Sequence, residues 1–339
     1  MRFSTSAFAP ACTSPNHCEA DPLRLYPDAS DGEAAVTRYR VFPGMELDYR
    51  DVHARVCREL RDGSGERLEI HHCLEGRVEY RQNGRYFYLS PGDLAVARTS
   101  SLPPDSRFPT GHYHGITVTI DPAAAPECLS CILSDVEVRP AALMEKLCPG
   151  RTVFTARSSR RVKHVFSELY AVPEDIRKGY LKVKLLELLL FLSTLSPEDG
   201  QTPHGCTAAQ VTLAEQVKAR LLAESDRTLT LKSLSQQFNV SEAQIKSSFT
   251  GVYGMSPASY ARSQRMHGAA ALLRETDRTV LDIACQFGYD NASKFARAFR
   301  DVIGVSPREY RAGAEYDSCA PQLGEKPVSL SDADVERRI

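Results

Sequence analysis

The sequence predicts an α+β protein: a β-barrel or jelly-roll domain, then helices, then an all-α domain with two helix-turn-helix motifs. Three observations carry this prediction. Short β-branched and aromatic runs fill the segment from Ala34 to Asp121, and helical apolar spacing replaces them after Pro140. The pattern F-x-x-x-x-G-x-S-P-x-x-Y begins at Phe249 and again at Phe299. A chain of 339 residues, 42% hydrophobic and 25% charged, is long enough for two or three such domains.

The N-terminal third contains the predicted strands. Residues 1–33 are rich in Pro, Ser and Asp without periodicity, so we expect a mobile leader. The turn sequences DGSG, QNG and SPGD separate the short apolar runs that follow, and QNG at 82–84 is a good hairpin signal. These runs indicate a barrel or jelly roll over residues 34–139. The expected strands are 36–42, 67–74, 76–82, 84–89, 94–98 and 115–120.

Residues 140–195 have helical periodicity, with helices expected at 141–147, 160–171 and 180–195. In the third helix, leucines at steps of four and three form one seam, and further apolar residues lie off it. Such a helix needs two neighbours to bury it. Either a second subunit, which would make the chain a homodimer, or the chain's own domain can cover the seam. The candidate dimerisation residues are Leu181, Leu185, Leu188, Leu192 and Leu195.

Composition bounds the remaining possibilities. The longest apolar run, 185–192, is far shorter than the roughly 20 residues of a membrane helix. The N-terminus has no apolar stretch typical of a secretory signal, so we expect a cytoplasmic protein with no membrane partner. Ten scattered cysteines suit reduced thiols better than a disulfide framework. Cys128 and Cys131 form a C-x-x-C that could be a redox pair or half a zinc site, but no second pair completes four ligands.

Residues 196–207 are polar and rich in Pro and Gly, which predicts a linker, and residues 313–339 have little to bury, which predicts a disordered tail. The helical domain between them, 208–312, is slightly basic. Residues 206–312 contain 14 Lys and Arg against 10 Asp and Glu, a net charge of +4 in a chain whose total is −1. This asymmetry is mild and favours a nucleic-acid partner only weakly.

The first repeat reads as two short helices joined by a tight turn. Leu231, Leu234 and Phe238 form one apolar stripe, and Thr230 is placed to cap that helix. After a break at 239–240, Ser241 is placed to cap the second helix, with Gln244 three residues on. The second repeat follows at an offset of 49 to 50 residues, with the turn at 288–290. Its apolar stripes are Val280, Ile283, Ala284 and Phe287, then Phe295, Phe299 and Val302.

The repeated pattern ends one helix and starts the next. Glycine fits the left-handed conformation at a helix end, serine caps the following helix, and proline fits its first turn. The tyrosine one turn later can pack back on the phenylalanine. The helix between the repeats, 257–273, would span about 26 Å, which can hold two recognition helices roughly 34 Å apart on one side of a duplex. The paired positions are Gly254 and Gly304, Ser256 and Ser306, Pro257 and Pro307, and Tyr260 and Tyr310.

Residues 271–311, ALLRETDRTVLDIACQFGYDNASKFARAFRDVIGVSPREYR, resemble the signature of AraC/XylS-type transcriptional regulators. The resemblance covers about 207–312 and implies two DNA-reading helix-turn-helix motifs. The first repeat departs from the pattern because Ser235 replaces a small Ala and its second helix is less basic. The implied groove-facing residues are Ser293, Lys294, Arg297 and Arg300 in the second repeat, and Ala243, Lys246 and Ser247 in the first. Arg262, Arg265 and Arg308 are expected to hold phosphates.

Arg297 is the best candidate for base recognition, because arginine can pair bidentately with a guanine edge. The segment LEGRVEYRQNGRYFYLSPGDLAV also resembles the cupin-like ligand-binding domain that these regulators often carry. The candidate residues for a small-molecule pocket there are His71, His72, Tyr80, Tyr86, Tyr88, His112 and His114. The same histidines with Glu79 invite a metal hypothesis, but their order is wrong for the cupin arrangement, and a pocket wall is the preferred interpretation.

The sequence therefore predicts a sequence-specific DNA-binding regulator that is not an enzyme, needs no cofactor, and forms a homodimer. A small-molecule effector would bind its N-terminal domain and alter how it meets double-stranded DNA or RNA polymerase. The alternative is a metal-dependent cupin enzyme, or a thiol or metal sensor, fused to a DNA-binding module. No G-x-S-x-G, P-loop or H-E-x-x-H motif supports catalysis. An alkyl-transfer repair protein would need a P-C-H-R cysteine, which is not present.

Overall fold

The computed structural model describes residues 22–61, 65–125, 138–150, 152–157, 159–200, 205–223 and 230–319, with side chains up to residue 313. By its contacts the chain forms two compact units. One comprises residues 1–217 and 240–254, and the other comprises residues 218–239 and 255–339. Strands occupy the N-terminal part and helices the C-terminal part, which confirms the α+β class. Cys128 and Cys131 lie outside the described residues.

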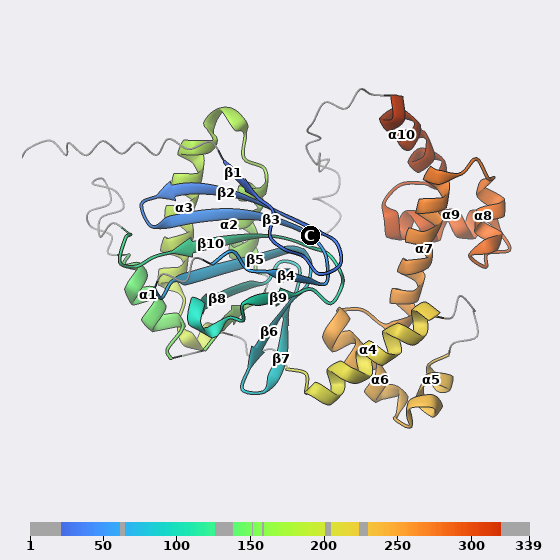
Figure 1. The fold of residues 1–339 in the computed structure, drawn as a ribbon, viewed down its shortest axis with the longest axis horizontal. Helices are drawn as coiled ribbons and strands as arrows, with labels where there is room; N and C mark the ends of the chain where they lie inside the picture. The colour runs from blue at the N-terminus through green and yellow to red at the C-terminus, as the bar shows by residue number, and fades with distance from the viewer. Residues whose placement is uncertain are drawn as a thin grey trace, which may run out of the picture. The chain divides into compact units, whose positions relative to one another are not determined.

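The strands of the first unit are antiparallel throughout and form one large sheet and two small ones (Figure 1). The seven-stranded sheet has the order β1-β2-β3-β10-β5-β8-β11, and β4-β9 and β6-β7 are two-stranded. The bounds are β1 Leu23–Leu25, β2 Glu33–Phe42, β3 Met45–His53, β4 Val56–Arg58, β5 Leu68–Gly76, β6 Val78–Gln82, β7 Arg85–Leu89, β8 Leu94–Arg98, β9 Asp105–Arg107, β10 Tyr113–Ile120 and β11 Phe154–Ala156.

All six predicted strands are present, as β2, β5, β6, β7, β8 and β10. The structure differs from the predicted strands in two places. Strand β1 lies within the segment expected to be a mobile leader, where it pairs with β2. Strand β3 was not predicted, although it pairs with both β2 and β10 and so lies near the middle of the sheet. Its side chains alternate between apolar residues such as Leu47 and charged residues such as Asp48, so its two faces meet different surroundings.

Three helices cover one face of the large sheet (Figure 1): α1 Pro140–Leu147, α2 Arg160–Tyr170 and α3 Arg177–Thr194. They confirm the three helices expected in 140–195. Apolar side chains of β3, β5, β8 and β10 pack against them in one continuous core. The leucine seam of α3 belongs to this core, since Leu181, Leu185, Leu188 and Leu192 are all buried in it. Of the two alternatives for the seam, the structure favours burial within the chain's own domain, because these leucines pack in the core under the sheet.

The described residues also form short 3-10 segments, η1 Thr99–Ser101, η3 Glu174–Ile176 and η4 Pro197–Asp199. The last of these lies in the predicted linker. Another residue of that linker, Cys206, forms a bridge with Tyr86 of β7, with N···O distances of 2.8 and 2.9 Å. Among the described cysteines, Cys57, Cys73, Cys148 and Cys206 are free and buried, and Cys285 is free and exposed.

The helices that follow are α4 Ala208–Ala223, α5 Leu231–Phe238, α6 Glu242–Tyr253, α7 Pro257–Glu275, α8 Val280–Gln286, α9 Ala292–Ile303 and α10 Pro307–Cys319. Helices α7 to α10 share one core in the second unit, built around Met266, Ile283, Phe295 and Phe299. Helix α10 continues past Ala312, where the sequence predicted a disordered tail, and residues 320–339 lie outside the described part. In the part of the chain that the structure describes, no helix has the length and apolar character of a membrane span.

Candidate nucleic-acid interface and sensor cavities

Helix α9 is the best-defined candidate for DNA recognition, and local signals set both of its ends. The Oδ1 of Asn291 accepts hydrogen bonds from the backbone N–H of Ser293 at 2.7 Å and of Lys294 at 3.4 Å. At the other end Gly304 has a φ of 92°, a left-handed conformation that favours glycine. The N-terminal end of α9 is thus capped and its C-terminal end is sharply defined.

The two faces of α9 are chemically different. Phe295, Ala298 and Phe299 are buried in the core of the second unit. The four predicted groove-facing residues are exposed. Among the described residues no carboxylate lies within ion-pair distance of Arg297, while Lys294 Nζ lies 4.0 Å from Asp290. The exposed set is Ser293, Lys294, Arg297 and Arg300.

The repeated pattern stops and restarts the helix as predicted. Ser306 Oγ accepts the backbone N–H of Glu309 at 3.3 Å, and the Glu309 carboxylate accepts the backbone N–H of Ser306 at 2.8 Å. These hydrogen bonds lower the pKa of Glu309. Tyr310 packs edge-on against Phe299, with ring centroids 5.7 Å apart. Arg308 is exposed on the first turn of α10.

Helix α6 has the same local design with fewer charges. Ser241 Oγ accepts the backbone N–H of Gln244 at 3.2 Å, and Gly254 ends the helix with a φ of 75°. The predicted groove-facing residues Ala243, Lys246 and Ser247 are all exposed, but only one of them carries a charge.

The predicted phosphate contacts on α7 differ in exposure. Ser256 caps this helix by accepting the backbone N–H of Ser259 at 3.1 Å. Arg262 is exposed, while Arg265 is half-buried and donates from Nε to the carbonyl oxygen of Ala261 at 3.2 Å. Arg262 is therefore better placed than Arg265 to reach a phosphate.

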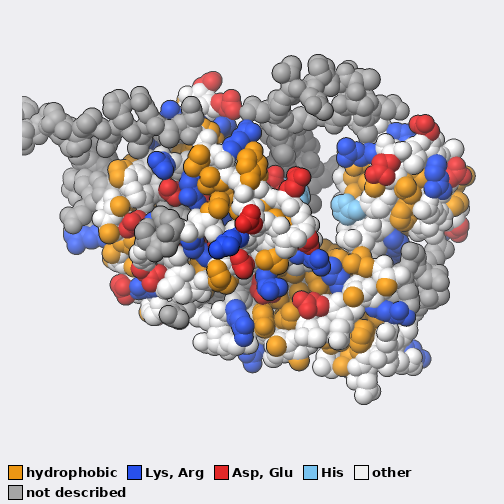
Figure 2. Space-filling view, in the orientation of Figure 1, with side chains coloured by type: hydrophobic (Ala, Val, Ile, Leu, Met, Phe, Trp, Pro, Cys, Tyr) orange, Lys and Arg blue, Asp and Glu red, His pale blue; other side chains and the backbone are white. Residues whose placement is uncertain are grey.

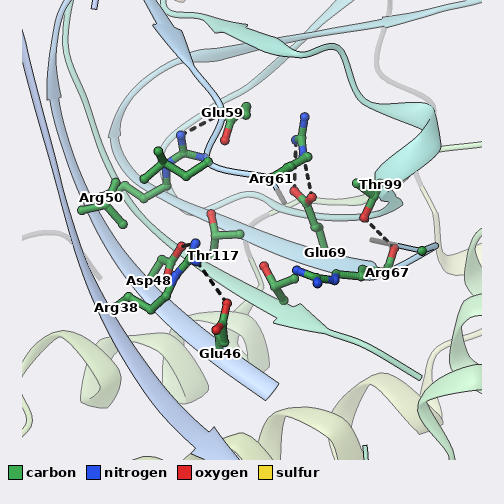
Figure 3. Close-up of a pocket in the computed structure, with 14 residues that line it drawn as sticks. Arg38, Glu46, Asp48, Arg50, Glu59, Arg61, Arg67, Glu69, Thr99 and Thr117 are labelled. Carbon is green, nitrogen blue, oxygen red and sulfur yellow. Dashed lines mark hydrogen bonds and ion pairs between the residues drawn. The ribbon is translucent and has the colours of Figure 1, made fainter. Parts of the chain in front are cut away.

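In the first unit, charged side chains that form ion pairs make up most of the wall of a small cavity (Figure 3). Arg38 binds Asp48 with two hydrogen bonds of 2.8 Å, and Arg61 binds Glu69 at 2.7 and 3.2 Å. Arg50 binds Glu59 at 2.9 Å. The cavity volume is about 40 Å³, which fits a few water molecules but not an ordinary metabolite.

The charges around this cavity stabilise one another. Burial acts to raise the pKa of Glu69, but hydrogen bonds from His71 and Arg61 outweigh it and hold that pKa below its ordinary value. Burial likewise acts to raise the pKa of Glu59, but the charge and hydrogen bond of Arg50, together with Arg61 and Ser106, hold that pKa below its ordinary value. On the face shown in Figure 2, basic and acidic side chains also intermingle over the strand-rich part.

The structure brings the predicted pocket residues together only in part. His71 lies edge-on against Tyr80, with ring centroids 5.9 Å apart. His71 and His72 are neighbours on β5, so the pleat directs them to opposite faces. His71 Nδ1 lies 3.2 Å from Thr117 Oγ1, near the charged cavity, whereas His72 stacks on Phe166 of α2 at 4.1 Å between ring centroids. Burial lowers the pKa of His72 to about 4, so it is neutral at physiological pH.

The tyrosines and the remaining histidines also separate. Tyr80 and Tyr88 line a void of about 10 Å³, too small for a ligand. The Tyr88 hydroxyl donates to Glu79 at 3.0 Å. Tyr86 lies under the Arg81 guanidinium, 5.4 Å from the ring centroid. His112 is exposed.

Of the predicted set, His114 lines a cavity of useful size among the described residues, about 290 Å³. This volume is close to the lower limit of small-molecule sites, roughly 300 Å³. The lining combines phenol groups with charged residues, and one of these phenols, Tyr49, donates its hydroxyl to the carbonyl oxygen of Leu169 at 2.6 Å. The principal lining residues are Arg24, Tyr26, Tyr49, Arg50, Asp51, His114 and Tyr170.

The charged residues of β2 and β3 were missed as candidate site residues. Their signal in the sequence is alternation: in Met45–His53 every second residue from Met45 to Tyr49 is apolar, Glu46 and Asp48 lie between them, and Arg50 follows. That pattern predicts a strand with one apolar face, but it does not reveal that the charged face is also buried.

Comparison with known proteins identifies a matching family model and several relatives. A family model described as "Helix-turn-helix domain" matches residues 234–313. The chain is 35% identical over 275 residues to an uncharacterized HTH-type transcriptional regulator, YdiP, of Escherichia coli (strain K12), covering 77% of this chain and 88% of the relative. It is 24% identical over 259 residues to the arabinose operon regulatory protein of Salmonella typhimurium, covering 71% and 82%. A solved structure of a probable AraC family transcriptional regulator from Rhodopseudomonas palustris is 30% identical, with a TM-score of 0.28, and covers 30% of this chain and 97% of that one.

These relatives are transcriptional regulators, not enzymes, and the match to the first spans most of both chains. The chain contains the helix-turn-helix signature over residues 234–313 and strands before it, as the predicted regulator requires. The protein is therefore a member of the AraC/XylS-type family of transcriptional regulators.

Proposed function

We propose that this regulator recognises its DNA site through the exposed face of α9, with Arg297 reading a base edge. The observation that carries the proposal is the contrast between the two faces of this helix. Its phenylalanines are buried, and its outer face carries Arg297 without an ion-pair partner among the described residues. An arginine in the major groove pairs bidentately with guanine, a contact that discriminates by roughly 1–3 kcal/mol.

Helix α6 serves as a second and weaker recognition helix in this proposal. Lys246 is the single charged residue among its three candidates, so α6 contributes more to position than to sequence preference. Arg262 and Arg308, both exposed near helix starts, hold phosphates. Because two non-identical helices lie in one chain, the preferred DNA site is asymmetric.

Small-molecule sensing belongs to the first unit. The cavity of about 290 Å³ supports it, since its phenol groups, arginines and single carboxylate suit a small polar molecule rather than an apolar one. Such an effector acts only if it binds one arrangement of the protein better than the other. Homodimerisation and contact with RNA polymerase stay predictions. If α3 takes part in a dimer, it uses its outer face, where Val183 is exposed and Leu186 half-buried.

The test of DNA recognition compares Arg297→Ala with Arg274→Ala, a matched variant that removes another exposed arginine of the same unit, on α7. Fluorescence anisotropy with a footprinted fragment flanking the protein's own gene gives both affinities. We expect Arg297→Ala to lose roughly 5- to 150-fold on the best site and to relax preference at one base pair. Arg274→Ala should bind almost as the parent does.

An equal loss on specific and random duplexes would show that Arg297 contacts phosphate, and the base-reading role would be withdrawn. In that case the slope of log affinity against log salt should fall by about one.

The test of effector sensing repeats the footprinting in the presence of candidate metabolites. One of them should change how much of the DNA site the protein occupies. Unchanged occupancy with a metabolite that binds the protein would contradict effector control.

A further inference from the structure

Three residues with metal-binding side chains converge on the face of the large sheet that carries α1 to α3, away from the charged cavity. Asp51 and His53 are two residues apart on β3, so they lie on one face. His114 on β10 is the register partner of Asp51. The strand pleat therefore places Asp51 and His53 together, and the pairing of β3 with β10 brings His114, which is distant in the sequence, beside them.

The distances suit one bound ion. Asp51 Oδ1 lies 3.0 Å from His53 Nε2 and 3.4 Å from His114 Nδ1. One potential ligand atom from each of the three residues lies within 4.8 Å of the others. Zn²⁺ binds imidazole nitrogen and carboxylate oxygen at about 2.0–2.2 Å, so two of its ligands can be up to about 4 Å apart. Small side-chain rotations would bring all three onto one ion.

Exposure and charge also favour a cation from solution. The side chains of His53, Asp51 and His114 are 61%, 55% and 32% exposed, so an ion can reach them. Glu33 is the register partner of His53 on β2, and Glu75 is that of His114 on β5. Two arginines also line the adjoining cavity. Arg24 is exposed to solvent, and Arg50 is buried and bound to Glu59, which limits their repulsion of a cation.

We propose that Asp51, His53 and His114 form a binding site for a divalent transition-metal ion of the Zn²⁺ class. Imidazole with one carboxylate suits Zn²⁺ and its neighbours better than Mg²⁺ or Ca²⁺, which prefer oxygen ligands. Three protein ligands leave a coordination position open. Because Asp51 and His114 also line the cavity of about 290 Å³, that position adjoins a space for a small ligand. The proposal is independent of the proposed DNA recognition and can fail or hold without it.

The experiment uses the full-length protein, stripped with EDTA and exchanged into metal-free buffer. Isothermal titration with Zn²⁺ compares the parent chain with His53→Gln and His114→Gln. The matched control is His164→Gln, which removes a 65% exposed histidine of α2 that also lies near carboxylates, 4.0 Å from Glu168 and 3.7 Å from Glu187. We expect one equivalent of Zn²⁺ on the parent chain and on the control, and at least tenfold weaker binding for each of the other two variants.

Substitution with Co²⁺ gives a second readout that does not depend on variants. Imidazole and carboxylate ligation should give visible d–d bands without the intense near-ultraviolet band of a cobalt–thiolate bond. A thiolate band would place the metal on cysteines and overturn the proposal. Equal Zn²⁺ affinity in His53→Gln, His114→Gln and the parent would also overturn it, as would no binding by the parent at micromolar Zn²⁺. Circular dichroism on each variant establishes that it is folded.

Discussion

Replacing Glu69 with Gln tests whether ion pairs hold the charged cavity together. Glu69 accepts hydrogen bonds from Arg61 Nε at 2.7 Å and Nη2 at 3.2 Å, and it lies 3.2 Å from His71 Nε2. Glutamine has the same shape but no charge, so the partly buried Arg61 head group loses its bidentate anionic partner. A buried ion pair that loses one member costs about 3–5 kcal/mol. Because the Arg61 side chain is still 19% exposed, we expect about 3 kcal/mol, the lower end of that range.

The pH dependence of this loss follows from the pKa of Glu69, which is lower in the folded protein than in the unfolded chain. As the pH falls, the unfolded chain therefore takes up this proton first. The stabilisation by Glu69 is fully present above the unfolded pKa of about 4.3 and declines as the pH falls towards the folded pKa. The difference in unfolding free energy between the parent and Glu69→Gln should thus shrink below about pH 4.3.

Urea unfolding followed by far-ultraviolet circular dichroism measures the effect, because the chain has no Trp for fluorescence. The control is Glu145→Gln, which breaks the 2.7 Å pair between Arg98 and a 69% exposed carboxylate and should cost less than about 1 kcal/mol. If Glu69→Gln also costs less than about 1 kcal/mol, the reasoning from burial is refuted. A loss that does not change with pH would refute the assigned pKa direction.

Two further predictions concern helix ends and the leucine seam. Gly304→Ala should destabilise the second unit by about 1 kcal/mol in thermal unfolding, because Gly304 has a φ of 92°. The control is Gly313→Ala on α10, which should leave the stability unchanged or raise it in the same assay. Leu185→Ala should reduce the unfolding free energy by about 2–5 kcal/mol, and it should leave the sedimentation coefficient, which reports the oligomeric state, unchanged. Leu186→Ala should reduce the unfolding free energy by less, because Leu186 is only half-buried. Loss of a dimer in Leu185→Ala without loss of stability would instead restore the seam as an interface.

The second helix-turn-helix could be predicted in detail because its determinants are local. Asn291, Gly304 and Ser306 act on backbone groups within a few residues, so their spacing in the sequence is their spacing in the structure. The contact of Tyr310 with Phe299 followed from the same helical geometry. Helix α7 begins at Pro257 as predicted and ends at Glu275, two residues past the expected Leu273.

The candidate sensor sites could not be predicted in the same way. His71 and His72 were assigned to one pocket, but consecutive residues of a strand point to opposite faces, so one faces the charged cavity and the other packs on α2. Strand β3 was missed because charged residues normally indicate a solvated face. In the structure Asp48 and Arg50 are buried, since Arg38 and Glu59 supply the opposite charges.

The amino-acid sequence by itself determined the α+β class, the two helix-turn-helix motifs, and the exposed basic face of α9. Each depends on interactions between residues within one or two helical turns, which a periodic pattern records. Only the tertiary structure decided which charged side chains meet in the small cavity and that Asp51, His53 and His114 converge. These side-chain contacts depend on the strand register across the large sheet, and that register is set by packing of the whole sheet against α1 to α3.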